Sequence, residues 1–187
     1  MMAQRACALI RLLCGAVLAL LLAVPSAHAD DNVAEAAGHN DANKVLKLLG
    51  GGSSCNEVDE NGRTGLALAA MNGNLQIAAI LIKAGAHLDV KDKQGNTALH
   101  YAADRDHADV AQLLLDVGAA VDPENKIGMT PLMIAANRGN AAIVQGLLAK
   151  GASVRKADYT GRDALAWATD SHRPLVVQML QRAPTAH

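Results

Sequence analysis

The stretch that decides the fold is TPLMIAANRGN, residues 130–140. Versions of its first half recur as TALHYAA, which begins at Thr97, and as TGLALAA, which begins at Thr64. The interval between successive starting points is constant, and one further step of the same length reaches Asp163, which begins DALAWAT. A strict period of this kind is typical of an array of small structural repeats.

Each copy of the repeat has the pattern of two short helices. Thr97 is a good N-cap, because its hydroxyl can accept from the free N–H groups of the first turn. The next repeat places Pro131 at the first helical position, which proline favours. Apolar residues at helical spacing follow in the first helix at Leu99, Ala102 and Ala103, and in the second at Val110, Leu113, Leu114 and Val117. Gly118 then ends the second helix, since a left-handed backbone costs glycine little.

The same spacing is kept along the chain. The glycines that end the second helices are Gly52, Gly85, Gly118 and Gly151. The glycines of the turns before the first helices are Gly62, Gly95, Gly128 and Gly161. One leucine register contains Leu48, Leu81, Leu114, Leu147 and Leu180. Two short helices cannot bury such faces alone, but copies stacked on one another can.

The unit G-x-T-P-L-x-x-A-A, a second helix ending in L-L-x-x-G-A and the length of the period resemble the ankyrin repeat. The resemblance implies an all-α solenoid of helix-turn-helix units, each followed by a short β-hairpin finger. It covers residues 30–187 as one ankyrin-repeat domain. About five repeats are expected, at 30–58 (the N-terminal cap), 59–91, 92–124, 125–157 and 158–187 (the C-terminal cap).

Residues 1–29 have the pattern of a cleaved secretory signal peptide. Arg5 and Arg11 precede a run without a polar side chain, 12–24, and the segment ends in the A-x-A motif at 27–29. The alternative is a transmembrane helix, but this run is shorter than the ~20 residues that span a bilayer. We therefore expect a periplasmic or secreted mature chain, with no membrane association after cleavage.

Both ends of the array have the residues of terminal caps. Asp31 lies one repeat length before Thr64, so it is expected to be the N-cap of the first helix. Gln181 and Arg182 stand at positions that are apolar in other repeats, as a solvent-facing last helix requires. The protein is expected to be a monomer.

The chain departs from the family pattern at two points. Many ankyrin repeats have histidine after the leucine of T-P-L-H, and here only His100 keeps it. The resemblance implies a framework hydrogen-bonding role for this residue, so its loss elsewhere should lower stability and leave function intact. Gly65 stands where the family has proline and should weaken the start of its helix.

Catalytic and metal-binding motifs are not found in the sequence. There is no G-x-S-x-G elbow, phosphate loop or dinucleotide fingerprint, so no enzyme activity and no cofactor are expected. His100 and His107 suggest a metal pair, but nothing completes a ligand set at metal spacing. The preferred interpretation of Cys55 is an incidental loop residue, and the alternatives are a reactive thiol or an intermolecular anchor. A net charge of −1 without a basic stripe argues against nucleic-acid binding.

In a repeat array the framework positions recur, so the varying positions are the candidates for partner recognition. The resemblance places the ends of the first helices and the finger tips on one side. The candidates there are Met71, Asn72, Lys93, Gln94, Asp104, Arg105, Lys126, Ile127, Met129, Asn137, Arg138, Tyr159 and Arg162. The apolar or aromatic anchors that an interface needs are Met71, Ile127, Met129 and Tyr159. The alternative is that all of these are ordinary solvated tips. Trp167 is expected to pack between repeats, with partial exposure as a binding anchor as its alternative.

The function we expect is that of a periplasmic adaptor or scaffold that binds another protein through the concave face and the fingers. The resemblance implies two alternatives. One is an immunity or inhibitor protein that neutralises one toxin or enzyme. The other is a support factor for a periplasmic enzyme such as catalase, through stress protection or through haem or metal delivery, which would use His39 and other exposed histidines.

Overall fold

The computed structural model describes residues 32–183, which contain ten α-helices and no regular strand. The chain divides into two units, Met1–Asp31 and Asn32–His187, and all of these helices belong to the second. The signal peptide predicted for residues 1–29 lies outside the described residues. No helix within the described part of the chain is both long and apolar enough to cross a membrane.

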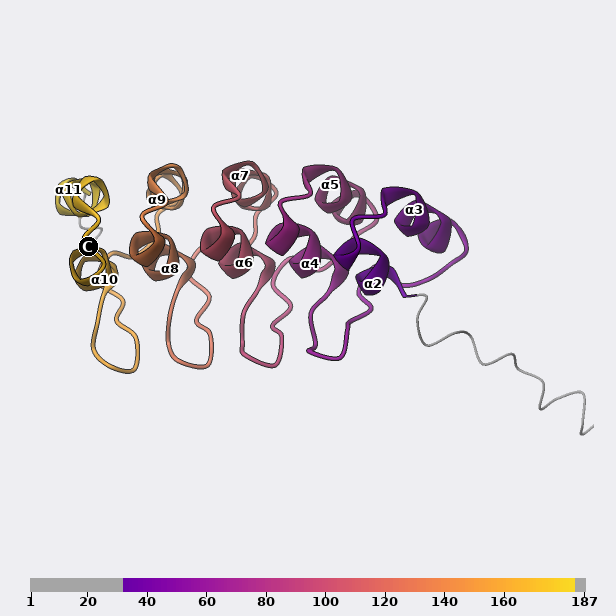
Figure 1. The fold of residues 1–187 in the computed structure, drawn as a ribbon, viewed down its shortest axis with the longest axis horizontal. Helices are drawn as coiled ribbons and strands as arrows, with labels where there is room; N and C mark the ends of the chain where they lie inside the picture. Colours follow the sequence, from indigo (N-terminus) through magenta and orange to yellow (C-terminus); the bar gives the residue numbers. More distant parts are fainter. Residues whose placement is uncertain (1–31, 184–187) are drawn as a thin grey trace, which may run out of the picture. The chain divides into compact units, whose positions relative to one another are not determined.

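Each repeat contributes one inner and one outer helix. The inner helices are α2 (Val33–Gly38), α4 (Gly65–Asn72), α6 (Ala98–Arg105), α8 (Pro131–Arg138) and α10 (Ala164–Asp170). The outer helices are α3 (Ala42–Gly50), α5 (Leu75–Lys83), α7 (Ala108–Asp116), α9 (Ala141–Ala149) and α11 (Pro174–Arg182). Figure 1 shows them as two layers, with the fingers projecting from the inner layer on the side away from the outer one. The expected all-α repeat solenoid is confirmed.

The inner helices begin at the capping residues that the repeat predicts. The side-chain oxygens of Thr64, Thr130 and Asp163 accept from the backbone N–H three residues on, at 3.2, 3.4 and 2.8 Å. The prediction for the first helix is wrong by one residue, because Asn32 is the N-cap of α2 and its Oδ1 accepts from the N–H of Glu35 at 2.7 Å. Asp31 itself lies outside the described residues.

The structure explains why position 65 holds glycine, although glycine weakens the start of its helix. A Cβ at this position would lie 3.2 Å from Cδ1 of Leu81 and 3.3 Å from the carbonyl oxygen of Val33. Such contacts are tighter than ordinary packing, so the first and second repeats approach one another more closely here than a larger residue would allow. The missing side chain therefore serves the contact between these two repeats.

The core runs the length of the array and is built from small residues in the inner layer. Ala69, Ala102, Ala135 and Ala168 occupy one register and are all 0 % exposed. The leucines between the layers, Leu81, Leu114 and Leu147, are also 0 % exposed, and each contributes about 2 kcal/mol of burial. Because the inner helices carry alanine where they face one another, they pack closely and set the fingers side by side.

Candidate partner-binding surface

One side chain fixes the conformation of each finger. Oδ1 of Asp92 accepts from the backbone N–H of Gln94 and of Asn96, both at 2.8 Å. The residues that make the same pair of bonds in the other fingers are Asp59, Asn125 and Asp158. Such Asx turns order a loop without the support of a sheet. The finger tips are therefore presented in a defined conformation.

Backbone hydrogen bonds join neighbouring fingers. The N–H of Lys126 donates to the carbonyl of Gln94 at 2.9 Å, and the N–H of Tyr159 donates to the carbonyl of Ile127 at 3.2 Å. The N–H of Lys93 makes the same bond to the preceding finger at 3.0 Å. These five predicted partner residues thus form one connected surface, which we call the finger ledge.

Two large apolar side chains stand out on the finger ledge. Ile127 is 60 % exposed and Tyr159 is 73 % exposed. The ring of Tyr159 lies against Gly128, where a Cβ would come within 2.7 Å of the ring carbon Cδ1. The glycine thus makes room for the ring, which rests on the ledge with its other face open. Ordered aromatic and branched side chains of this kind are suited to anchor a partner.

Met129 does not have the exposure that the sequence analysis assigned to it. Its side chain is 7 % exposed, because the residue lies where the finger returns to α8, directly before the cap Thr130. The prediction that this side chain is exposed is therefore wrong, and its contact with a partner stays a prediction. Met71 is half-buried, and its sulfur lies 3.6 Å from Nη1 of Arg63. Its contact with a partner stays a prediction.

The ends of α6 and α8 carry three charged residues of the predicted set. Nε and Nη2 of Arg138 donate to Oδ1 of Asp104 at 2.8 and 2.6 Å, and Nε of Arg105 lies 3.4 Å from Oδ2. The side chains of Arg105 and Arg138 are 58 % and 54 % exposed. An ion pair this open to water contributes less than about 1 kcal/mol to stability. Both guanidinium groups therefore remain accessible to a partner.

Two asparagines of the predicted set have contacts within the array. Nδ2 of Asn72 donates to the carbonyl of Gly38 at 2.8 Å, which joins the second repeat to the first. Oδ1 of Asn137 accepts from the hydroxyl of Ser171, which joins the fourth repeat to the fifth. Asn72 therefore helps to close the end of α2, and its contact with a partner stays a prediction.

In the last repeat, Arg162 covers the ring of Trp167. The guanidinium carbon lies 3.8 Å from the ring centroid, a cation–π geometry, and Nη1 lies 3.7 Å from Oδ2 of Asp170. Nε1 of Trp167 donates to Oδ2 of Asp158 at 3.0 Å. Burial alone would raise the pKa of Asp158, but hydrogen bonds from Thr160, Arg162 and Trp167 lower it below its ordinary value. Trp167 is half-buried against the core, in keeping with a packing role.

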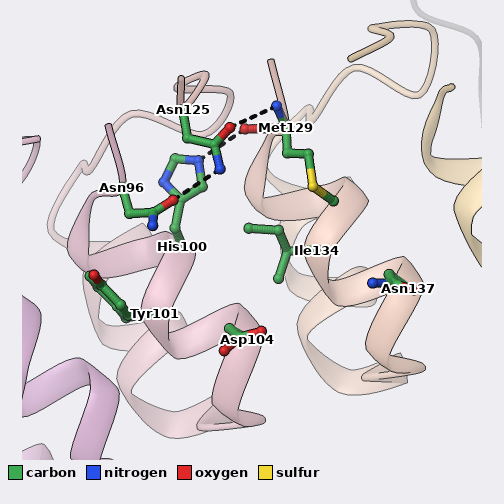
Figure 2. A pocket seen from close by; sticks show the side chains of 8 residues that line it. All are labelled: Asn96, His100, Tyr101, Asp104, Asn125, Met129, Ile134 and Asn137. Atoms are coloured by element: carbon green, nitrogen blue, oxygen red, sulfur yellow. Dashed lines mark hydrogen bonds between the residues drawn. The ribbon is translucent and has the colours of Figure 1, made fainter. Parts of the chain in front are cut away.

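A hollow of about 240 Å³ opens between α6 and α8 (Figure 2). Its lining includes Asp104, Met129 and Asn137 of the predicted set, and also Asn96, Tyr101 and Ile134, which are outside that set. The sequence does contain a signal for the hollow, which is the difference in residue type at one position of the repeat. Positions 63, 96, 129 and 162 hold Arg, Asn, Met and Arg, and the hollow is lined by the two that are not arginine, Asn96 and Met129.

His100, which also lines the hollow, has both ring nitrogens in use. Nδ1 accepts from the N–H of Thr97 at 3.1 Å, so the proton is on Nε2, which donates to the carbonyl of Met129 at 3.1 Å. Burial lowers the pKa of His100 to about 4, so the ring is neutral at pH 7. Nε2 of His107 lies 3.2 Å from the carbonyl oxygen of Met71. Within residues 32–183 no group of three or more His, Cys, Asp or Glu is placed to hold a metal ion.

Cys55 is half-buried, and its thiol lies 3.4 Å from the carbonyl oxygen of Ala84 in the next repeat. A weak S–H donor in such a contact behaves as a small packing residue. The structure thus gives this cysteine a neighbour in the array, in line with the preferred interpretation of an incidental loop position.

The fold and the surface are those of an array that presents varied side chains on a repeated frame. No curated protein matches the chain. The family model described as ankyrin repeats (3 copies) matches residues 33–125 and 117–186. Ankyrin repeats generally mediate protein–protein interaction and are typically without catalytic activity. The two matches together span most of the chain, which therefore belongs to the ankyrin repeat family.

Proposed function

We propose that the protein is an exported adaptor, periplasmic or secreted, that binds another protein through the finger ledge and the ends of α6 and α8. The observation that carries the proposal is the pair of exposed anchors on the ledge, Ile127 at 60 % and Tyr159 at 73 % exposure. Backbone bonds hold these residues in ordered fingers, so little conformational entropy is lost when a partner covers them.

Polar and charged side chains surround the two anchors. Lys126 stands beside Ile127 on the ledge, and Arg105 and Arg138 are accessible at the helix ends. Apolar anchors within a polar rim are the usual composition of a specific, non-obligate interface. Such an interface suits a protein that is stable alone and meets its partner later. Export of the protein is supported by the signal-peptide pattern of residues 1–29.

Crosslinked capture from a periplasmic extract tests this function, with residues 30–187 as bait. The ledge variant carries Ile127→Glu and Tyr159→Glu. The matched control carries Leu46→Glu and Leu175→Glu, since these apolar residues of α3 and α11 are 51 % and 59 % exposed but lie off the ledge. We expect the parent and the control to capture the same partner, and the ledge variant to lose it.

Titration of the identified and purified partner makes the result quantitative. Two anchors worth about 2 kcal/mol each predict a Kd at least about 100-fold higher for the ledge variant and unchanged for the control. Equal binding by the parent and the ledge variant contradicts the proposed surface. Loss of a partner's own activity on binding favours the inhibitor alternative over the scaffold.

A further inference from the structure

The hollow between α6 and α8 exists because a long side chain is missing there. In the second repeat, Arg63 fills the corresponding space. Its Nε donates to Oδ2 of Asp59 at 2.8 Å, and its Nη1 reaches the sulfur of Met71 at 3.6 Å. Arg63 thus bridges the base of the finger and the end of the inner helix.

Arg162 of the fifth repeat also extends from the base of its finger toward the end of its inner helix, although the described residues contain no repeat after it. Arg162 lies over Trp167 and reaches to 3.7 Å from Asp170, which stands at the end of α10. In the third repeat the register position is Asn96, whose Oδ1 accepts from Nδ2 of Asn125 at 3.0 Å. Asn96 is too short to reach Asp104 at the end of α6, and the space stays open.

The size of the hollow suits one side chain. Its volume is about 240 Å³, whereas pockets for drug-sized ligands begin at roughly 300 Å³. It opens between the finger bases and the helix ends, in the middle of the surface that carries the proposed partner contacts. A partner lying on the finger ledge would therefore be able to insert one residue here.

The lining offers a donor and an acceptor across an apolar middle. Oδ1 of Asn137 accepts from Ser171, and Figure 2 shows the amide nitrogen turned toward α6. On α6, Oδ1 of Asp104 is bonded to Arg138, while Oδ2 has the looser 3.4 Å contact to Arg105. Ile134 and Met129 line the space beside these polar groups (Figure 2).

Charged side chains fit this lining poorly. A lysine or arginine would meet Asp104, but Arg138 at 2.6 Å and Arg105 at 3.4 Å already balance that carboxylate. A third cation would be placed among like charges. An aspartate or glutamate would place a second carboxylate beside Asp104. No arginine or lysine lines the hollow and the ring of His100 is neutral, so nothing in the lining balances the added charge.

An apolar side chain fits no better. It would cover Asn137 and Asp104 without replacing the hydrogen bonds that these groups make to water, and such uncompensated burial is costly. A carboxamide satisfies both groups, since its oxygen can accept from Nδ2 of Asn137 and its nitrogen can donate to Oδ2 of Asp104. Its aliphatic stem would lie against Ile134 and Met129.

We propose that the hollow between α6 and α8 is a recognition pocket for one carboxamide side chain, glutamine or asparagine, supplied by the bound protein. The proposal rests on the proposed function, because it names a residue that the partner places on the same surface. It also assigns a role to Asn96, which leaves the pocket open where the second repeat fills the corresponding space with Arg63.

Peptide selection tests the pocket without knowledge of the natural partner. Random linear peptides displayed on phage are selected on residues 30–187 and counter-selected on the Asn96→Arg variant, in which the new side chain should fill the pocket. Arginine is already accommodated in this register at Arg63 and Arg162. Ile134→Trp is a second filling variant, because Trp167 occupies the same register in the last repeat.

We expect the peptides that need the open pocket to share one glutamine or asparagine. Replacing that residue by leucine, glutamate or lysine should raise the Kd of the synthetic peptide about 10-fold or more, and both filling variants should do the same. A shared lysine, arginine, acidic or apolar residue overturns the proposal, and so does a selection in which no peptide distinguishes the parent from the filled variants.

The natural partner separates this proposal from the one on which it rests. Loss of the partner by Ile127→Glu with Tyr159→Glu, together with full binding by Asn96→Arg, leaves the adaptor function in place and overturns the pocket. Equal binding by all variants contradicts both. Binding weakened by each variant, with a carboxamide at the contact, supports both.

Discussion

His100 couples the stability of the protein to pH. Its pKa is about 4 in the folded chain, against 6.5 for an ordinary histidine, because burial disfavours the charged ring. Between pH 6.5 and pH 4 the unfolded chain binds a proton that the folded chain does not. The stabilisation is therefore complete above pH 6.5 and is lost as the pH falls toward 4, by about 3 kcal/mol in all.

Replacing His100 by methionine should remove this pH dependence. Met133 occupies the same register in the next repeat and is 1 % exposed, so the fold has room for methionine there. At pH 7 the variant loses the bonds to Thr97 and Met129 and should be less stable by about 1–3 kcal/mol. Urea unfolding at pH 7 and pH 5 measures both effects. If the free energy of unfolding falls by the same amount from pH 7 to pH 5 in the parent and in the variant, His100 is excluded as the cause.

Between the two helices of a repeat, one residue has a left-handed backbone, and a side chain of the next repeat packs against it. The sizes of these two residues are matched. Gly73 lies beneath His107, and a Cβ would come within 2.4 Å of the ring nitrogen Nδ1. Where the left-handed residue is Asn40, the next repeat instead supplies the small Asn74, at 3.3 Å between the side-chain amides. A large side chain thus lies over glycine and a small one over asparagine.

Exchanging this pair should produce coupled effects on stability. Gly73→Asn alone should destabilise by about 2 kcal/mol or more, because the new side chain meets the His107 ring. Adding His107→Asn reproduces the Asn40–Asn74 pair and should recover a large part of the loss. A double-mutant cycle in urea measures the coupling, expected at about 1–3 kcal/mol. Strictly additive changes would show that the ring does not cause the clash.

The fingers are elements whose order depends on one residue each. Asp92 is 7 % exposed, and besides its two backbone bonds it accepts from the hydroxyl of Tyr101, whose pKa is raised to about 12 by burial and by this carboxylate. Asp92→Ala should therefore destabilise by about 1–3 kcal/mol. Hydrogen exchange should show faster exchange of the Gln94 and Asn96 amides. The amide of Lys126 should follow, since it donates to Gln94. Unchanged exchange at Lys126 would mean that the ledge is not cooperative.

The helices were predictable from the sequence because the period repeats the same local chemistry. A cap such as Thr130, a Leu-x-x-Ala-Ala face and a terminal glycine each specify a helix start, face or end. The exposure of Met129 was not predictable, because it depends on where a finger turns back to its helix and not on residue type. The hollow was missed for a related reason. The hollow exists because position 96 holds asparagine where other repeats hold arginine. This effect is seen only when the side chains at positions 63, 96 and 162 are compared in space.

Contacts in the array as a whole run between adjacent repeats. Each inner helix packs on the inner helices before and after it, and the outer helices follow the same order (Figure 1). Stability in such an array is a sum of repeat and nearest-neighbour terms, so the repeats at the ends lack one interface. The last repeat, α10 with α11, is at the end of the described array, and Leu175 remains exposed there.

Fluorescence of Trp167, the only tryptophan of the chain, reports on this last repeat, whereas circular dichroism reports on all helices. We expect the fluorescence transition in urea to come first, because a local deficit of about 1 kcal/mol lowers the midpoint by about 0.5 M for a slope of ~2 kcal/mol/M. A control chain with Trp167→Phe and Tyr101→Trp places the reporter at the same register of the third repeat. There the fluorescence and dichroism curves should coincide. Coincident curves for both reporters would instead show that the array unfolds as a single cooperative unit.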